Sequence, residues 1–286
     1  MTGHHSLRTR GLVSGYGRSI VVDGVDVEIP AGRVSVIVGA NACGKSTLLK
    51  TLSRLVPVQS GAVVLDDRPI GEVPTKELAR TLGLLPQQPV APEGIAVADL
   101  VGRGRHPHQR LFRSWTADDD RAVTEALRAT GVIDLADRPV DELSGGQRQR
   151  VWIAMALAQE TDILLLDEPT TFLDVSHQIE VLDLLTDLNA TRGTTIVMVL
   201  HDINLAARYA DHLFAMRAGR VVAAGAPRTV VTSELVREVF DLDAVVIDDP
   251  VSGTPLVLPR GRHRVLPAAR TASPTAPTAP TTGASA

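Results

Sequence analysis

Hydrophobic residues follow two patterns along this chain of 286 residues. Almost wholly apolar runs, typical of strands buried on both faces of a parallel sheet, occur at 34–38, 163–166 and 195–200. Segments with apolar residues at helical spacing occur between or after these runs, at 47–52, 75–81, 117–130 and 176–188. This alternation of strands and helices predicts an α/β fold with a mostly parallel sheet.

Other stretches of the chain depart from this alternation. Alternating apolar and polar positions over 12–29, and a short run at 61–65, predict further strands and turns. From residue 88 to about 160 the pattern is mostly helical, which indicates a helical insertion in the α/β domain. We expect the polar segment 1–8 to be frayed and the Ala/Pro/Thr-rich segment 266–286 to be a disordered tail.

Composition narrows the class of protein. A net charge of -4 gives no general attraction to nucleic acid or anionic lipid, and a single cysteine, Cys43, excludes an internal disulfide. The amino terminus has no long apolar segment typical of a signal peptide, and no run approaches the ~18 apolar residues of a membrane span. We expect a cytosolic chain that reaches a membrane only through a partner.

The stretch from Gly39 to Ser46 fits G-x-x-x-x-G-K-[ST], the pattern of a phosphate-binding loop. It lies between a predicted strand and a predicted helix, which is the context that this loop requires. Backbone N–H groups of such a loop converge on an anion, and the helix N-terminus adds partial positive charge. Lys45 would reach the β- and γ-phosphates and the Ser46 hydroxyl would ligate Mg²⁺. A chance glycine turn before a helix is the alternative interpretation.

Two acidic residues, Asp167 and Glu168, end the apolar strand at 163–166, and His201 follows the strand at 195–200. Ligands of parallel sheets bind at the carboxyl ends of the strands. We therefore expect Asp167 to hold Mg²⁺, Glu168 to accept a proton from a water aimed at the γ-phosphate, and His201 to bond that phosphate or water. A solvated turn and an ordinary strand-end histidine are the alternatives.

The segment Leu143–Gln147 reads Leu-Ser-Gly-Gly-Gln. Ser144 can cap a following helix, while Gly145 and Gly146 let backbone amides approach a ligand closely. This is a second anion site at a second helix N-terminus. An antiparallel dimer, with each nucleotide between the phosphate loop of one copy and the Ser144 turn of the other, would use both sites.

From about residue 12 to residue 258 the chain resembles the ATP-binding subunit of an ABC transporter, with the family's motifs in the family's order. Gly39 to Ser46 match Walker A, Gln87 the Q-loop glutamine, and Leu143 to Gln147 the signature motif. Asp167 and Glu168 match the Walker B aspartate and the catalytic glutamate, 171–174 the D-loop, and His201 the H-loop. Tyr16 lies where the family's aromatic residue stacks on adenine, although strand packing is its alternative role.

The resemblance implies roles for these residues. Catalysis would involve Glu168, His201 and Gln87, and Mg²⁺ would be held by Ser46, Gln87 and Asp167. ATP would be bound by Tyr16, Gly39, Asn41, Ala42, Cys43, Gly44, Lys45, Ser46, Thr47, Ser144, Gly145, Gly146, Gln147 and Asp174. Ala40 and Ala42 depart from the family pattern, which usually has Pro and Gly at these positions. If residue 42 needs a positive φ, alanine costs about 1 kcal/mol or more there.

The resemblance also implies the organisation of the protein. We expect a P-loop NTPase (RecA-like) fold over 9–265, with a mostly parallel sheet, an N-terminal antiparallel β part and an inserted helical subdomain at about 88–160. Two copies would bind ATP between them on the cytoplasmic face of the cell membrane. Their partners would be transmembrane permease subunits and, indirectly, a substrate-binding protein, with no nucleic acid.

Segments 103–109, 167–174 and 177–178 are similar to those of importers of ferric siderophores, haem and cobalamin, with siderophore uptake the nearest. A haem or cobalamin importer ATPase is the alternative within this class. A soluble ABC protein acting in translation or DNA maintenance is disfavoured because the chain has one signature motif and no heptad run. An inactive nucleotide-binding scaffold is disfavoured because Lys45, Asp167, Glu168 and His201 are all present.

Overall fold

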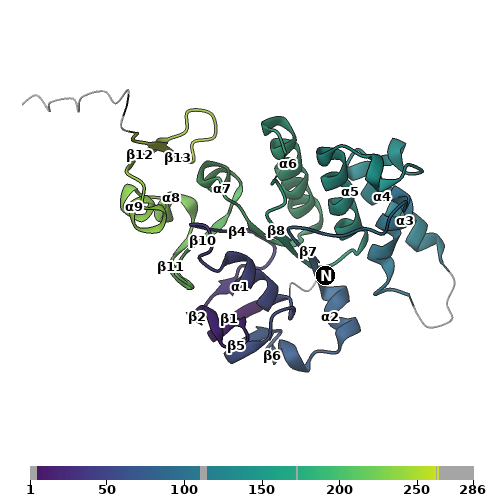
Figure 1. Cartoon of the computed structure of the whole chain (residues 1–286), viewed down its shortest axis with the longest axis horizontal. Helices are drawn as coiled ribbons and strands as arrows, with labels where there is room; N and C mark the ends of the chain where they lie inside the picture. Colours follow the sequence, from purple (N-terminus) through teal and green to yellow (C-terminus); the bar gives the residue numbers. More distant parts are fainter. Residues whose placement is uncertain (1–4, 110–114, 172, 262, 264–286) are drawn as a thin grey trace, which may run out of the picture.

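The computed structural model describes residues 5–109, 115–171, 173–261 and 263. A six-stranded sheet lies at its centre (Figure 1). In spatial order its strands are β11 (Arg220–Gly225), β10 (His212–Arg217), β4 (Val34–Gly39), β9 (Thr195–Val199), β8 (Ile163–Asp167) and β7 (Leu82–Leu85). Neighbouring strands from β10 to β7 are parallel, and β11 pairs antiparallel with β10. The predicted α/β fold with a mostly parallel sheet is confirmed.

The strands β4, β8 and β9 are continuous apolar runs because both of their faces are covered, and all of their residues are buried. Side chains of a strand alternate between the two faces. Ile163 and Leu165 belong to one hydrophobic cluster, which includes α1 (Lys45–Leu52), whereas Leu164 and Leu166 belong to the other, which includes the remaining long helices.

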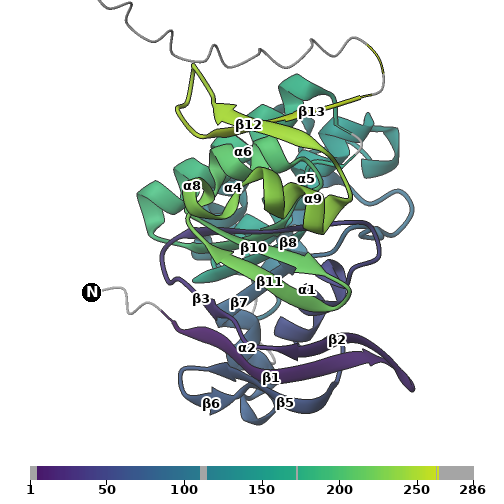
Figure 2. The ribbon, with the colours of Figure 1, turned by 90° about the vertical axis from the view of Figure 1, so that its left-hand side faces the viewer.

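A second, antiparallel sheet forms the amino-terminal part of the fold (Figure 2). Its strands are β1 (Leu7–Tyr16), β2 (Ser19–Val25), β3 (Glu28–Ile29), β5 (Val58–Leu65) and β6 (Arg68–Pro69). Its apolar residues share a cluster with Leu49 of α1 and Ile37 of β4. Helix α1 therefore lies between the two sheets, which positions the loop at its amino terminus.

The expectation of a frayed segment 1–8 is wrong for the part that the structure describes. Leu7 and Arg8 belong to β1, and the Leu7 side chain is only 1% exposed. Leu7 pairs with Ile29 on one side and Leu65 on the other, and the Ser6 N–H donates to Asp66. One buried leucine anchors a strand in an otherwise polar segment, which a short pattern does not reveal.

A helical segment connects β7 to β8 and lies on the right in Figure 1. It contains α3 (Val97–Gly102), the 3-10 turns η2 (Arg103–Arg105), η3 (Ile133–Leu135) and η4 (Val140–Glu142), and the helices α4 (Ala117–Ala129) and α5 (Gly145–Ala158). Leu100, Leu127 and Ile153, one from each helix, are buried together in the cluster on that side of the sheet. The predicted helical insertion is thus present between two sheet strands.

The remaining elements complete the two faces of the central sheet. They are η1 (Ile70–Glu72), α2 (Thr75–Thr81), α6 (Val175–Arg192), α7 (Ile203–Tyr209), α8 (Pro227–Val230), α9 (Ser233–Phe240) and a hairpin of β12 (Ala244–Asp248) and β13 (Pro255–Pro259). Among the described residues, the helices are all too short or too polar to cross a membrane. The predicted tail, 266–286, lies outside the described residues.

Candidate nucleotide-binding site

The loop from Gly39 to Gly44 joins β4 to α1, and its backbone explains its glycines. A Cβ on Gly39 would lie 2.3 Å from the carbonyl oxygen of Met216, and Gly44 has a φ of +106°. Ala42 has a φ of 59°. This is the positive φ at which alanine costs about 1 kcal/mol or more. Lys45 is buried, and its Nζ donates to the carbonyl oxygens of Gly39 and Ala40 at 2.9 Å each.

Asp167 is the last residue of β8 and is 1% exposed. Its Oδ1 accepts a 2.7 Å hydrogen bond from the Ser46 hydroxyl, which joins the strand end to the phosphate-binding loop. Its Oδ2 is buried and accepts no hydrogen bond from the described residues, and the Nζ of Lys50 lies 3.9 Å from it. Burial raises the pKa of Asp167, while the hydrogen bond from Ser46 and the charge of Lys50 oppose that rise.

Glu168 is 8% exposed and is held by side chains from three segments. The Gln87 side-chain N–H donates to its Oε2 at 2.5 Å, and the Thr171 hydroxyl donates to the same oxygen at 3.1 Å. The Nε2 of His201 lies 2.6 Å from its other oxygen, Oε1. The three strand-end residues Gln87, Glu168 and His201 therefore form one cluster, because β7, β8 and β9 are adjacent in the sheet.

An open cavity of about 600 Å³ joins this cluster to the phosphate-binding loop. It is lined by Tyr16, Val21, Asn41, Ala42, Cys43, Gly44, Lys45, Ser46, Thr47, Gln87, Glu168 and His201. Tyr16, at the end of β1, is 54% exposed at this cavity. Gly39 and Asp167 do not line the cavity themselves. Gly39 accepts a hydrogen bond from Lys45, and Asp167 accepts one from Ser46, and both donors line the cavity. Two further residues belong to the site: Val21 lines the cavity, and Lys50 lies near Asp167. Neither is part of a sequence motif, so the sequence shows them only as residues of a strand and a helix.

The segment 144–147 and Asp174 are not among the described residues that line this cavity. Ser144 is the N-cap of α5 and forms a capping box with Gln147, so the predicted cap is confirmed. Gly145 is exposed, and a Cβ added to Gly146 would lie 3.6 Å from Leu173, close to the start of α6. The Ser144 turn is therefore not part of the cavity of its own chain.

Asp174 is the exposed N-cap of α6. Its Oδ1 accepts hydrogen bonds from the backbone N–H of His177 at 3.0 Å and from the Ser176 hydroxyl at 3.0 Å, and lies 2.7 Å from His177 Nδ1. These bonds, first the one from the His177 backbone, lower the pKa of Asp174. Asp174 therefore fixes the start of α6 in this chain.

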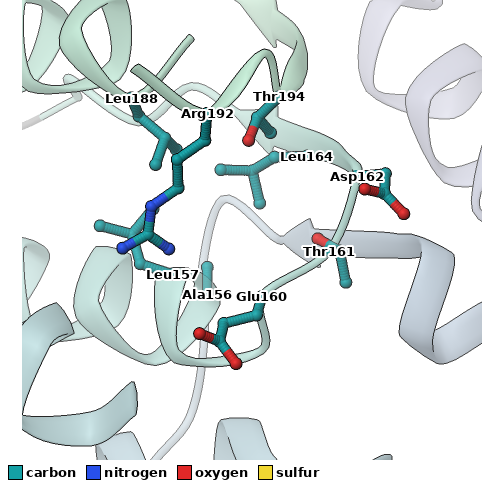
Figure 3. Close-up of a pocket in the computed structure, with 9 residues that line it drawn as sticks. All are labelled: Ala156, Leu157, Glu160, Thr161, Asp162, Leu164, Leu188, Arg192 and Thr194. Atoms are coloured by element: carbon teal, nitrogen blue, oxygen red, sulfur yellow. The ribbon is translucent and has the colours of Figure 1, made fainter. Parts of the chain in front are cut away.

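A smaller cavity, of about 120 Å³, lies where residues 160–162 and 192–194 lead into β8 and β9, at the opposite end of these strands from Glu168. Figure 3 shows the residues that line it. Its lining includes Glu160, Thr161, Asp162, Arg192 and Thr194. Among the described residues that line it, none belongs to the motifs of the sequence analysis. The larger cavity at the phosphate-binding loop is therefore the candidate functional site.

A mostly parallel sheet with a phosphate-binding loop and an adjacent strand-end carboxylate pair is typical of a P-loop nucleotide-binding domain. The family model described as ABC transporter matches residues 22–171. The chain belongs to the ABC transporter family and contains the ATP-binding domain of that family.

Two curated relatives match almost the whole chain. The ferric enterobactin transport ATP-binding protein FepC of Escherichia coli (strain K12) is 56% identical over 90% of this chain and 94% of its own length. The "Probable siderophore transport system ATP-binding protein YusV" of Bacillus subtilis (strain 168) is 53% identical over 92% of this chain and 96% of its own length. Among solved structures, the dimeric structure of MJ0796, a bacterial ABC transporter cassette, matches with a TM-score of 0.69 and 27% identity, over 77% of this chain and 98% of that one. The expected family and fold are thus confirmed.

Proposed function

We propose that this chain is the ATP-binding and hydrolysing subunit of an importer of ferric siderophores. Relatives with 53% and 56% identity carry names of siderophore and ferric enterobactin transport systems, and they match the chain almost from end to end. Two copies would work on the cytoplasmic face of the cell membrane, bound to permease subunits that receive the siderophore from a substrate-binding protein.

The observation that carries the ATP-hydrolysing part of this proposal is the cluster of Gln87, Glu168 and His201 at the wall of the cavity that the phosphate-binding loop also lines. Glu168 would accept the proton of the water that attacks the γ-phosphate. His201, 2.6 Å from Glu168, would orient that carboxylate and bond the γ-phosphate. Gln87 would orient the water and relay the state of the site to the helical segment beyond β7.

The residues of the loop would bind the rest of the nucleotide. Backbone N–H groups from Gly39 to Thr47, including those of Asn41, Ala42, Cys43 and Gly44, would surround the phosphates at the start of α1. Lys45 would turn from the carbonyl oxygens that it now contacts to the β- and γ-phosphates. Tyr16 presents an exposed aromatic ring on which adenine would stack.

The side chains beside the loop fit a magnesium ion. Asp167 has a buried oxygen without a hydrogen-bond partner among the described residues, and Ser46 and Gln87 offer further oxygens. Oxygen ligands of this kind suit Mg²⁺. Bound with ATP, Mg²⁺ would neutralise part of the phosphate charge.

A second copy of the chain would complete the site. Ser144, Gly145, Gly146 and Gln147 form a helix N-terminus that can bind an anion but lies outside the cavity of its own chain. In an antiparallel dimer this turn would contact the γ-phosphate bound by the other copy, and Asp174 would lie at the same interface. We propose residues 9–265 as the ATPase domain, with the helical subdomain at about 88–160 bound by the permease.

Transport of the proposed substrate is tested with the full complex of two copies and the cognate permease in lipid. We expect ATP hydrolysis to rise severalfold when binding protein loaded with a ferric siderophore is added, and the Glu168→Gln complex to show no rise. A rise with haem or cobalamin, and none with any ferric siderophore, would contradict the proposed substrate and leave the ATPase assignment in place.

A further inference from the structure

Thr171 makes two separate hydrogen bonds to the residue proposed as the catalytic base. Its backbone N–H donates to the carbonyl oxygen of Glu168 at 3.2 Å, and its hydroxyl donates to Glu168 Oε2 at 3.1 Å. We propose that Thr171 is a positioning residue that holds the Glu168 carboxylate toward the nucleotide. This inference rests on the proposed role of Glu168.

Glu168 needs such support because its backbone is strained. Its φ is 54°, a left-handed conformation that residues other than glycine rarely adopt. A strained residue keeps its conformation only where its surroundings fix it, and such residues occur often at active sites. The backbone bond from Thr171 closes the turn that follows β8, and the hydroxyl bond fixes the side chain of the same residue.

A second cavity shows from which side Thr171 acts. This cavity, of about 220 Å³, shares Glu168 and His201 with the nucleotide cavity, so these two side chains separate the two spaces. Thr171 lines the second cavity and is not among the described residues that line the first, whereas Gln87 lines only the first. The Glu168 Oε2 atom thus accepts one hydrogen bond from Gln87, which lines the nucleotide cavity, and one from Thr171, which lines the second cavity.

This arrangement gives the Thr171 hydroxyl a specific effect on the reaction. A carboxylate that accepts a water proton must stay within about 3 Å of that water, and small displacements reduce the rate strongly. The bond from Thr171 goes to Oε2, so Oε1 is left to His201, which lines both cavities.

The inference is tested first with Thr171→Val, which keeps the side-chain shape and removes the hydroxyl, and with Thr171→Ser, which keeps the hydroxyl. We expect Thr171→Val to lower kcat for ATP hydrolysis by the full complex about tenfold, with the Kd for ATP unchanged. We expect Thr171→Ser to retain the wild-type kcat to within about twofold. Thr186→Val is the matched control, because the Thr186 hydroxyl bonds Leu182 within α6, away from the site.

The decisive comparison is the double variant Thr171→Val/Glu168→Gln. If Thr171 acts through the carboxylate, adding Thr171→Val to Glu168→Gln causes no further loss of the residual rate. A further tenfold loss would mean that Thr171 acts by another route and would overturn the inference. An unchanged kcat in Thr171→Val would overturn it as well. A Glu168→Gln rate close to that of the wild type would instead contradict the proposed role of Glu168.

Discussion

At the scale of single residues, the candidate site contains a buried carboxylate whose charge opposes folding. Asp167 is 1% exposed, and one of its oxygens has no hydrogen-bond partner among the described residues. An ionised carboxylate in such a place is costly unless a cation is close. The ammonium of Lys50, 3.9 Å away, offsets only part of this cost, because the pKa of Asp167 is still raised. Without a bound ligand, the residue proposed to hold Mg²⁺ is therefore expected to destabilise the fold.

This cost predicts a pH-dependent effect of Asp167→Asn. Burial raises the folded-state pKa of Asp167 above the ordinary value of 3.8, so its charge opposes folding above that raised pKa. The penalty disappears as the pH falls below 3.8. We expect urea unfolding of the nucleotide-free variant at pH 7 to show about 1 kcal/mol more stability than the wild type, with a smaller gain near pH 4. A loss of stability at pH 7 would contradict this explanation.

Single residues also show what sequence patterns can and cannot predict. The positive φ of Ala42 follows from a loop in which glycine is usual, so its strain was predictable. The hydroxyl bond from Thr171 to Glu168 was not, because it depends on side-chain rotamers and on a turn with a left-handed residue. The partners of Lys45 within its own loop were unpredictable for the same reason.

At the scale of elements, two helix N-termini carry the proposed phosphate contacts. Helix α1 begins at Lys45 inside the cavity, and α5 begins after Ser144 outside it. The Ser144 hydroxyl accepts from the Gln147 N–H at 3.3 Å, and the Gln147 side chain accepts from the Ser144 N–H at 3.1 Å. The cap fixes the turn that would meet the nucleotide of the other copy.

Capping and phosphate binding by this turn can be separated with Ser144→Asp. Aspartate caps helices about as well as serine, so we expect the free energy of unfolding to change by less than about 0.5 kcal/mol. Its negative charge would repel the γ-phosphate, so we expect hydrolysis of ATP by the full complex to fall at least about tenfold. Thr232→Asp at the N-cap of α9 is the control, because Thr232 bonds Leu235 far from the cavity. Wild-type hydrolysis by Ser144→Asp would exclude the proposed contact.

The elements with strong hydrophobic patterns were predictable, and those whose bounds depend on pairing with strands distant in sequence were not. Strands β4, β8 and β9 form where the apolar runs predicted them, since burial on both faces demands such runs. The helix predicted over 117–130 is α4, which ends one residue earlier, at Ala129. The start of β1 at Leu7 depends on its pairing with β3 and β5, distant in sequence, so no local pattern could give it.

At the scale of the whole molecule, the residues proposed to bind the nucleotide lie in two separate places of one copy. The cavity collects Tyr16, the phosphate-binding loop, Gln87, Glu168 and His201, while Ser144 and Asp174 lie elsewhere on exposed surface. The sequence motifs predicted both sets of residues and suggested that the Ser144 turn serves the nucleotide of the other copy. The contacts of the individual side chains depend on the sheet order and could not be predicted. A shared nucleotide between two copies would bring the two sets together.

This claim is tested most directly by the mass of the full chain in solution. The Glu168→Gln variant should bind ATP without hydrolysing it, so the bound nucleotide would keep the two copies together. We expect sedimentation or light scattering with Mg-ATP to give twice the mass of one chain, and ADP, or Ser144→Asp added to the same variant, to give a single chain. A Glu168→Gln chain that is saturated with ATP and yet remains a monomer at all concentrations would contradict the account.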